Sequence, residues 1–124
     1  MNFSLKFIYF VTIFCILSGC ATPSEIRQTG FNRTVTVPGT PESVAHCVVG
    51  KLDDAFGTLS HLVRKNGEQY SVISRNHEQA TGVIDFREIG VTIEAKIYFG
   101  PAVLRKDRFG DKYEQAINEC ANRK

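Results

Sequence analysis

The strongest alternation of apolar and polar residues along the chain lies between positions 91 and 99. Its odd positions are all apolar, and the even positions carry polar side chains or tyrosine: Val91, Ile93, Ala95, Ile97 and Phe99 alternate with Thr92, Glu94, Lys96 and Tyr98. A period of two predicts a β-strand with one face buried and the other face in water. One amphipathic strand is therefore expected here.

Four shorter runs of the same character precede it, at residues 33–37, 59–64, 69–75 and 80–87. The second and third runs are separated by a segment that contains Asn66-Gly67. This pair is typical of a tight hairpin turn because both residues accept positive φ angles. Short strands joined by hairpins favour an antiparallel sheet.

Two segments instead have apolar residues at helical spacing. Thr40 and Pro41 favour a helix start, and apolar residues then recur every four positions at Val44, Val48 and Leu52. A final helix is predicted to begin at Asp111, with an apolar stripe formed by Tyr113, Ala116, Ile117, Cys120 and Ala121. Each helix has one apolar face, and both faces can be buried against one side of a sheet.

The order of elements is therefore strand, helix, four strands, helix. It predicts a single α+β domain over residues 33–124, a two-layer sandwich of an antiparallel sheet with two helices on one face. Residues 21–32 are mixed and polar, contain Pro and Gly, and follow neither period. We expect this stretch to be a tether.

The first 19 residues have the composition of an export signal. Lys6 precedes eleven mostly apolar residues, Phe7 to Leu17, which are too few for the roughly 20 that a membrane-spanning helix needs. The run is followed directly by the tetrapeptide Leu17-Ser18-Gly19-Cys20. This tetrapeptide resembles the lipobox of bacterial lipoprotein precursors.

The resemblance implies that Cys20 receives a diacylglyceryl thioether, that residues 1–19 are removed, and that Cys20 becomes the acylated N-terminus. The protein would then be held at a membrane of the bacterial cell envelope, on the periplasmic side, through its N-terminal lipid. In Gram-negative lipoproteins the next residue influences sorting. Ala21 at that position, in place of Asp, favours the outer membrane.

Two cysteines remain in the exported domain, Cys47 and Cys120, because Cys15 leaves with the signal and Cys20 is acylated. An oxidising compartment favours their pairing, and we predict a disulfide that joins the two helices. The competing interpretations are a pair of metal ligands and a catalytic thiol. Neither is favoured, since C-x-x-C spacing is missing and His46 would point about 100° around the helix from Cys47.

The net charge and the sequence motifs argue against several further classes of function. A net charge of +2, with scattered Lys and Arg, argues against nucleic acid as a partner. The three histidines, His46, His61 and His77, do not form a metal-binding or catalytic motif, and the sequence indicates neither a metal nor a cofactor. The oligomeric state has no signal in the sequence.

The leading hypothesis is a non-enzymatic accessory lipoprotein that binds or braces another envelope component, a protein or the cell wall. Arg87, Lys96 and Tyr98 on the polar face of the sheet are the candidate docking surface, with a merely solvated face as the alternative. A second hypothesis is a small-ligand binder with a groove lined by Phe56, Phe86 and Phe99. A third is an envelope hydrolase with a dispersed site, which a histidine meeting a carboxylate in a cleft would support.

Overall fold

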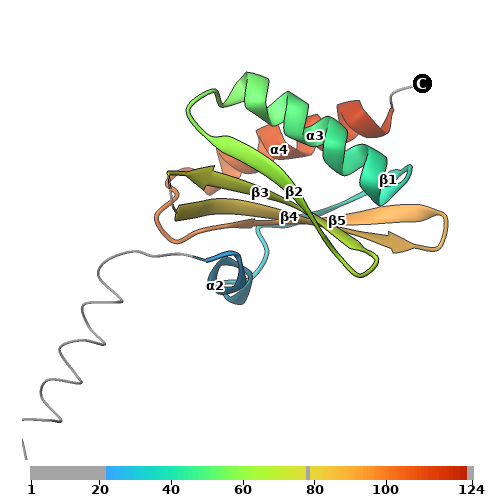
Figure 1. Ribbon diagram of the computed structural model, residues 1–124, viewed down its shortest axis with the longest axis horizontal. Coiled ribbons are helices and arrows are strands. Elements are labelled where there is room, and N and C mark those ends of the chain that lie inside the picture. Colours follow the sequence, from blue (N-terminus) through green and yellow to red (C-terminus); the bar gives the residue numbers. More distant parts are fainter. Residues whose placement is uncertain (1–21, 78, 123–124) are drawn as a thin grey trace, which may run out of the picture.

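The computed structural model describes residues 22–77 and 79–122. Its elements are α2 (Pro23–Gln28), β1 (Arg33–Pro38), α3 (Pro41–Ala55), β2 (Ser60–Asn66), β3 (Gln69–Asn76), β4 (Gln79–Ile89), β5 (Thr92–Phe99) and α4 (Lys106–Ala121). The five strands form one antiparallel sheet in the order β1-β5-β4-β3-β2. Helices α3 and α4 lie together on one face of this sheet (Figure 1). The predicted α+β two-layer sandwich is confirmed.

Helix α3 begins and is buried as its sequence predicts. Thr40 has extended backbone, and its hydroxyl accepts a hydrogen bond from the amide of Ser43, which satisfies one of the unpaired donors of the first turn. Pro41 occupies the first turn, where its missing N–H costs nothing. The predicted stripe of Val44, Val48 and Leu52 is buried against the sheet.

The main core lies between the sheet and the two helices. The largest side chains that it buries from the strands and from α4 are Val72, Ile84, Phe86, Ile93, Ile97, Phe99, Tyr113 and Ile117. Tyr113 is buried with its hydroxyl 2.7 Å from the hydroxyl of Ser74 on β3. Burial raises the pKa of Tyr113, and the hydrogen bond with Ser74 offsets part of that rise. The pair satisfies two polar groups that would otherwise be buried without partners.

Two predicted boundaries are wrong. Val91 is 94% exposed, because β5 begins at Thr92 and Val91 shares the β4–β5 turn with Gly90, which has a φ of +61°. Helix α4 begins at Lys106, after Arg105 in a left-handed conformation, so Asp111 is not its cap. Asp111 instead accepts a hydrogen bond of 2.7 Å from the guanidinium of Arg33 on β1.

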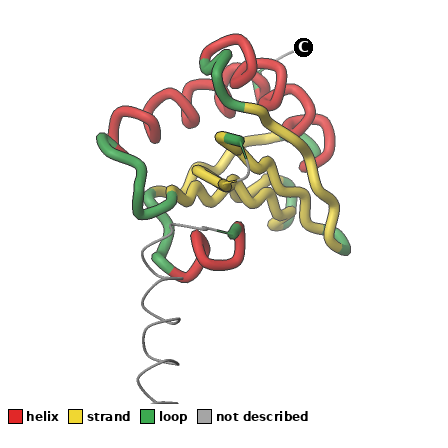
Figure 2. Tube along the Cα trace, turned by 60° about the vertical axis from the view of Figure 1, so that its left-hand side comes forward, coloured by secondary structure: helices red, strands yellow, loops and turns green. Residues whose placement is uncertain are grey.

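The prediction of a tether over residues 21–32 is also wrong for the part that the structure describes. Residues 23–28 form helix α2, which lies on the sheet face opposite α3 and α4 (Figures 1 and 2). Thr22 caps this helix by accepting a hydrogen bond from the amide of Glu25, and Pro23 again follows the cap. Ile26 is fully buried in a second apolar cluster with Ile73, Ala80 and Val83. The sheet therefore has a small third layer over part of its other face.

Candidate functional site

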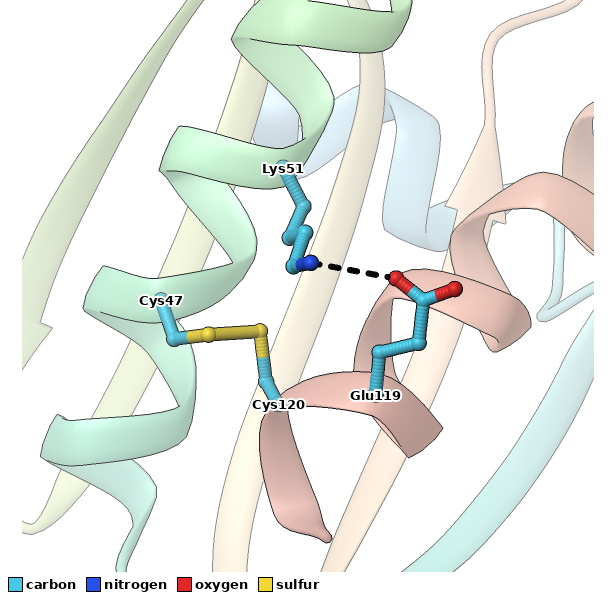
Figure 3. The surroundings of a disulfide bond; sticks show 4 residues. All are labelled: Cys47, Lys51, Glu119 and Cys120. Atoms are coloured by element: carbon cyan, nitrogen blue, oxygen red, sulfur yellow. Dashed lines mark ion pairs between the residues drawn. A yellow bond between two sulfur atoms is a disulfide. The ribbon is translucent and has the colours of Figure 1, made fainter. Parts of the chain in front are cut away.

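The structure pairs Cys47 on α3 with Cys120 on α4, as the sequence predicted (Figure 3). Their Cα atoms are 5.7 Å apart. Beside the disulfide, the ammonium of Lys51 lies 3.3 Å from the carboxylate of Glu119, a second link between the same helices. Hydrogen bonds from Gln115 and then from Lys51 lower the pKa of Glu119. The disulfide holds α3 and α4 together as one layer, and both sulfur atoms belong to it.

Two of the three predicted docking residues meet on the sheet face that carries α2. Arg87 on β4 lies opposite Glu94 on β5, and its guanidinium is 3.5 Å from the Glu94 carboxylate. The ammonium of Lys96 is 3.8 Å from the same carboxylate and 5.5 Å from the centre of the Phe31 ring. Because Arg87 is 62% exposed and Phe31 56%, this cluster is open to solvent.

The third predicted docking residue, Tyr98, has a different environment. It is half-buried and packs against the apolar cluster that contains Ile26. Burial raises the pKa of Tyr98, and the negative charge of Asp85 raises it further. The sequence expectation of a uniformly solvated face is wrong at this point, because α2 covers the end of the face on which Tyr98 lies.

Sequence reasoning missed an ion pair that fastens α2 to the sheet. Arg27 on α2 donates two hydrogen bonds of 2.8 Å to the carboxylate of Asp85 on β4, and a third of 3.2 Å to Ser71 on β3. The Ser71 hydroxyl also donates to Asp85, at 2.6 Å. Asp85 is only 8% exposed, so this carboxylate depends on its two partners. Its hydrogen bonds raise the pKa of Arg27, against the opposing effect of burial.

A polar hollow opens beside this ion pair. It has a volume of about 360 Å³ and is lined by Arg27, Arg64, Asn66, Gln69, Ser71, Ile73 and Asp85.

The signal for α2 was present in the sequence as Thr22-Pro23-Ser24-Glu25, the cap, proline and glutamate of a helix start. The short length of the helix hid this signal, because a single turn and a half shows no periodicity.

A histidine does meet a carboxylate in this fold, at His61 on β2. Its Nδ1 lies 2.8 Å from an oxygen of Asp53 on α3. The His61 side chain is completely buried, however, and its Nε2 has no hydrogen-bond partner among the described residues. The hydroxyl paired across the strands from it belongs to Ser74, which is buried and bonded to Tyr113. The Asp53 side chain is 51% exposed, but the buried His61 does not face a cleft in which it could exchange a proton with a substrate.

An apolar cavity of about 320 Å³ lies at the end of the helix layer. Its lining residues are Leu59, Thr81, Phe99, Val103, Leu104, Phe109 and Tyr113. Of the three phenylalanines expected to line a ligand groove, only Phe99 does so. Phe86 is fully buried in the core, and the ring of Phe56 packs against Phe109 and Tyr113 with centroids 5.4 and 5.9 Å apart.

Within residues 22–77 and 79–122, no group of three or more His, Cys, Asp or Glu side chains is placed to hold a metal ion. The same part of the chain contains no helix with the length and apolar character to cross a bilayer. Cys20, the predicted site of lipidation, lies outside the described residues.

We predict that the double substitution Cys47→Ala/Cys120→Ala strongly destabilises the domain. The disulfide closes a loop of 73 residues, and losing it returns roughly 4 kcal/mol of chain entropy to the unfolded state. The midpoint of urea unfolding should fall accordingly. Unfolding of the wild-type protein in the presence of a reductant should give the same midpoint. Two reactive thiols in the denatured, unreduced mature domain would contradict the pairing.

We also predict that Arg27→Met loosens α2. It leaves the Asp85 carboxylate buried with only Ser71 as a partner, at an expected cost of about 1–3 kcal/mol, reduced from a fully buried pair because Arg27 is one-third exposed. Hydrogen exchange of residues 23–30 should accelerate more than that of α3. Arg64→Met, which changes the same hollow without touching Asp85, is the matched control. Unchanged exchange in α2 would refute the role of this pair.

Comparisons with known proteins gave no relative for this chain. No protein-family model matches the sequence, and neither the curated proteins nor the solved structures gave a significant match. The proposals below therefore rest on the residues and the geometry of this chain.

Proposed function

We propose that this protein is a membrane-anchored lipoprotein of the bacterial cell envelope, whose domain acts as an interaction module. The observation that carries the proposal is Leu17-Ser18-Gly19-Cys20 placed directly after an apolar run of signal length. A cysteine in that position can take a lipid on sulfur and become the new N-terminus. Two or more acyl chains on one residue anchor a protein stably, since each buried methylene contributes about 0.8 kcal/mol.

The disulfide supports an exported location for the domain. Disulfides persist in the periplasm and outside the cell, and they are rare in reducing cytoplasm. Cys47 and Cys120 are bonded to each other in the fold, which leaves Cys20 as the one cysteine of the mature chain with no place in that bond. This division of roles is what a lipoprotein with one structural disulfide requires.

The interaction role is supported by how the domain is held together. The disulfide and the Lys51–Glu119 pair clamp α3 to α4 on one side of the sheet. The Arg27–Asp85 pair clamps α2 on the other side. A surface that is rigid before it meets a partner loses little conformational entropy on binding. A small, doubly clamped domain on a lipid anchor suits binding or bracing of another envelope component.

The anchor is tested by Cys20→Ala in cells. We expect this variant to keep residues 1–19 and to carry no fatty acid, because the sulfur that accepts the lipid is gone. Metabolic labelling with a clickable fatty acid and the intact mass of the protein measure both effects. Cys15→Ala, five residues earlier in the apolar run, is the matched control and should be labelled and processed normally. A wild-type protein with an unmodified N-terminus that stays out of membrane fractions would refute the anchor.

The interaction role is tested by photo-crosslinking in intact cells. A crosslinking amino acid is placed at Asp54 on the helix layer and, in a second strain, at Arg64 on the opposite face. At least one of the two positions should give a discrete adduct with an envelope protein or with the cell wall. The adduct should disappear when the anchor is removed by Cys20→Ala. Adducts with bulk lipid alone, from both positions, would contradict an interaction module.

A further inference from the structure

Helix α2 fixes where the chain leaves the domain toward its N-terminus. Ile26 is fully buried, and Arg27 holds Asp85 through two hydrogen bonds of 2.8 Å. Thr22, immediately before the helix, is tied to it by accepting a hydrogen bond from the amide of Glu25. The start of α2 is thus attached to one face of the sheet, opposite the α3–α4 layer (Figure 1).

Only Ala21 separates Thr22 from Cys20. Each residue extends the chain by at most about 3.5 Å, so the Cα atom of Cys20 lies within roughly 7 Å of that of Thr22. A lipid attached to Cys20 enters the bilayer at that point. With so short a connection, the side of the sheet that carries α2 is the side nearest the membrane.

The uncovered part of this side has the composition of a membrane-contacting surface. We call it the α2-side patch, and it consists of Phe31, Arg64, Arg87, Ile89 and Lys96. Arg87 and Lys96 share the carboxylate of Glu94, Arg64 lines the hollow beside Arg27, and Asp85 is occupied by Arg27. Its apolar members are both exposed, Phe31 at 56% and Ile89 at 43%. Exposed apolar residues beside Lys and Arg are typical of surfaces that lie on anionic lipid.

The helix layer on the opposite side of the domain carries no excess of basic side chains. Helices α3 and α4 together carry seven acidic and four basic side chains. Arg33 from the sheet is paired with two of the acids, Asp111 and Glu114, and Arg105 precedes α4, so seven acids face six bases in this layer. An anionic surface therefore attracts the α2-side patch more than the helix layer, at distances within the Debye length of about 8–10 Å.

We propose that the α2-side patch rests on the phosphate groups of anionic phospholipids in the leaflet that holds the anchor. This proposal rests on the proposed function, since it needs the lipid on Cys20. It gives the candidate docking residues Arg87 and Lys96 a partner, the bilayer surface, while Tyr98 packs beneath α2. It also directs the α3–α4 layer, with its disulfide, away from the membrane and toward other envelope components.

Two lysines of the native protein can report the orientation. Lys96 lies in the α2-side patch, with its ammonium 5.5 Å from the Phe31 ring, and Lys112 lies on α4, with its ammonium 5.8 Å from the Phe56 ring. Both amines lie over an aromatic ring, and Lys96 also lies 3.8 Å from the Glu94 carboxylate, so the labelling ratio in detergent micelles serves as the reference. The full mature lipoprotein is inserted into preformed vesicles and treated with a membrane-impermeant amine reagent. Mass spectrometry then gives the ratio of Lys96 to Lys112 labelling.

In vesicles that contain phosphatidylglycerol, we expect this ratio to fall several-fold below its value in detergent micelles. Vesicles of phosphatidylcholine alone should leave it near the micelle value. Arg87→Gln should restore labelling of Lys96 in the anionic vesicles. Arg108→Gln, which removes one charge from exposed α4, should not.

An unchanged ratio in anionic vesicles, or protection of Lys112 in place of Lys96, would overturn the orientation. Equal protection of Lys96 by neutral vesicles would overturn the contact with anionic phosphate groups. Flotation of the vesicles and the mass of the N-terminal peptide are measured on the same samples. Protein that is acylated and floats but fails the labelling test refutes the orientation alone. Protein that lacks acyl chains and does not float refutes the proposed function as well.

Discussion

Arg27 and Asp85 are 58 residues apart in the sequence, and their pairing decides how the N-terminal segment is held. Asp85 lies in a buried position of β4, where a carboxylate without partners would be costly. Arg27 and Ser71 supply those partners, and Ile26 adds apolar burial beside them. Together these contacts turn a stretch with tether-like composition into a helix fixed on the sheet. This attachment fixes the side of the sheet on which the chain leaves the domain toward its N-terminus.

The disulfide plays the corresponding part on the other face. Helices α3 and α4 come from different ends of the domain, and the bond between Cys47 and Cys120 joins them above the sheet. The sheet is therefore held between an ion pair on one side and a covalent bond on the other. Neither face can open without breaking a specific, identifiable link. Such a frame keeps the exposed charges of both faces in fixed relative positions.

Much of the fold was predictable from the sequence, and for physical reasons. The alternation from Ile93 to Phe99 and the four-residue spacing from Val44 to Leu52 are patterns that only one periodicity explains, and both elements are present as predicted. The disulfide followed from counting cysteines in a chain that its sequence predicts to be exported. These features depend on the local sequence or on the number of cysteines, and both can be read from one amino-acid sequence.

The features that were missed depend on partners far away in the chain. The sequence around Arg27 does not indicate that Asp85 will be buried beside it. The sequence around Asp111 likewise does not indicate that its carboxylate will accept a hydrogen bond from Arg33. The start of α4 escaped prediction because Arg105 precedes it without a side-chain cap. At the candidate site, strand alternation alone predicts that Arg87 and Lys96 lie on the same face as Glu94. The burial of Tyr98 could not be predicted in this way, because it depends on the packing of α2 on that face.

The order of the strands has a consequence for how the domain assembles. Strands β2 to β5 are joined by successive hairpins, which close short loops and can form early. Strand β1 instead pairs with β5, so the chain must close a long loop before that edge is complete. Helix α2 immediately precedes β1 and rests on β4 and β5. Its docking is thus expected late in folding. Under the proposed function, a newly exported chain would carry its lipid before it acquired a fixed orientation.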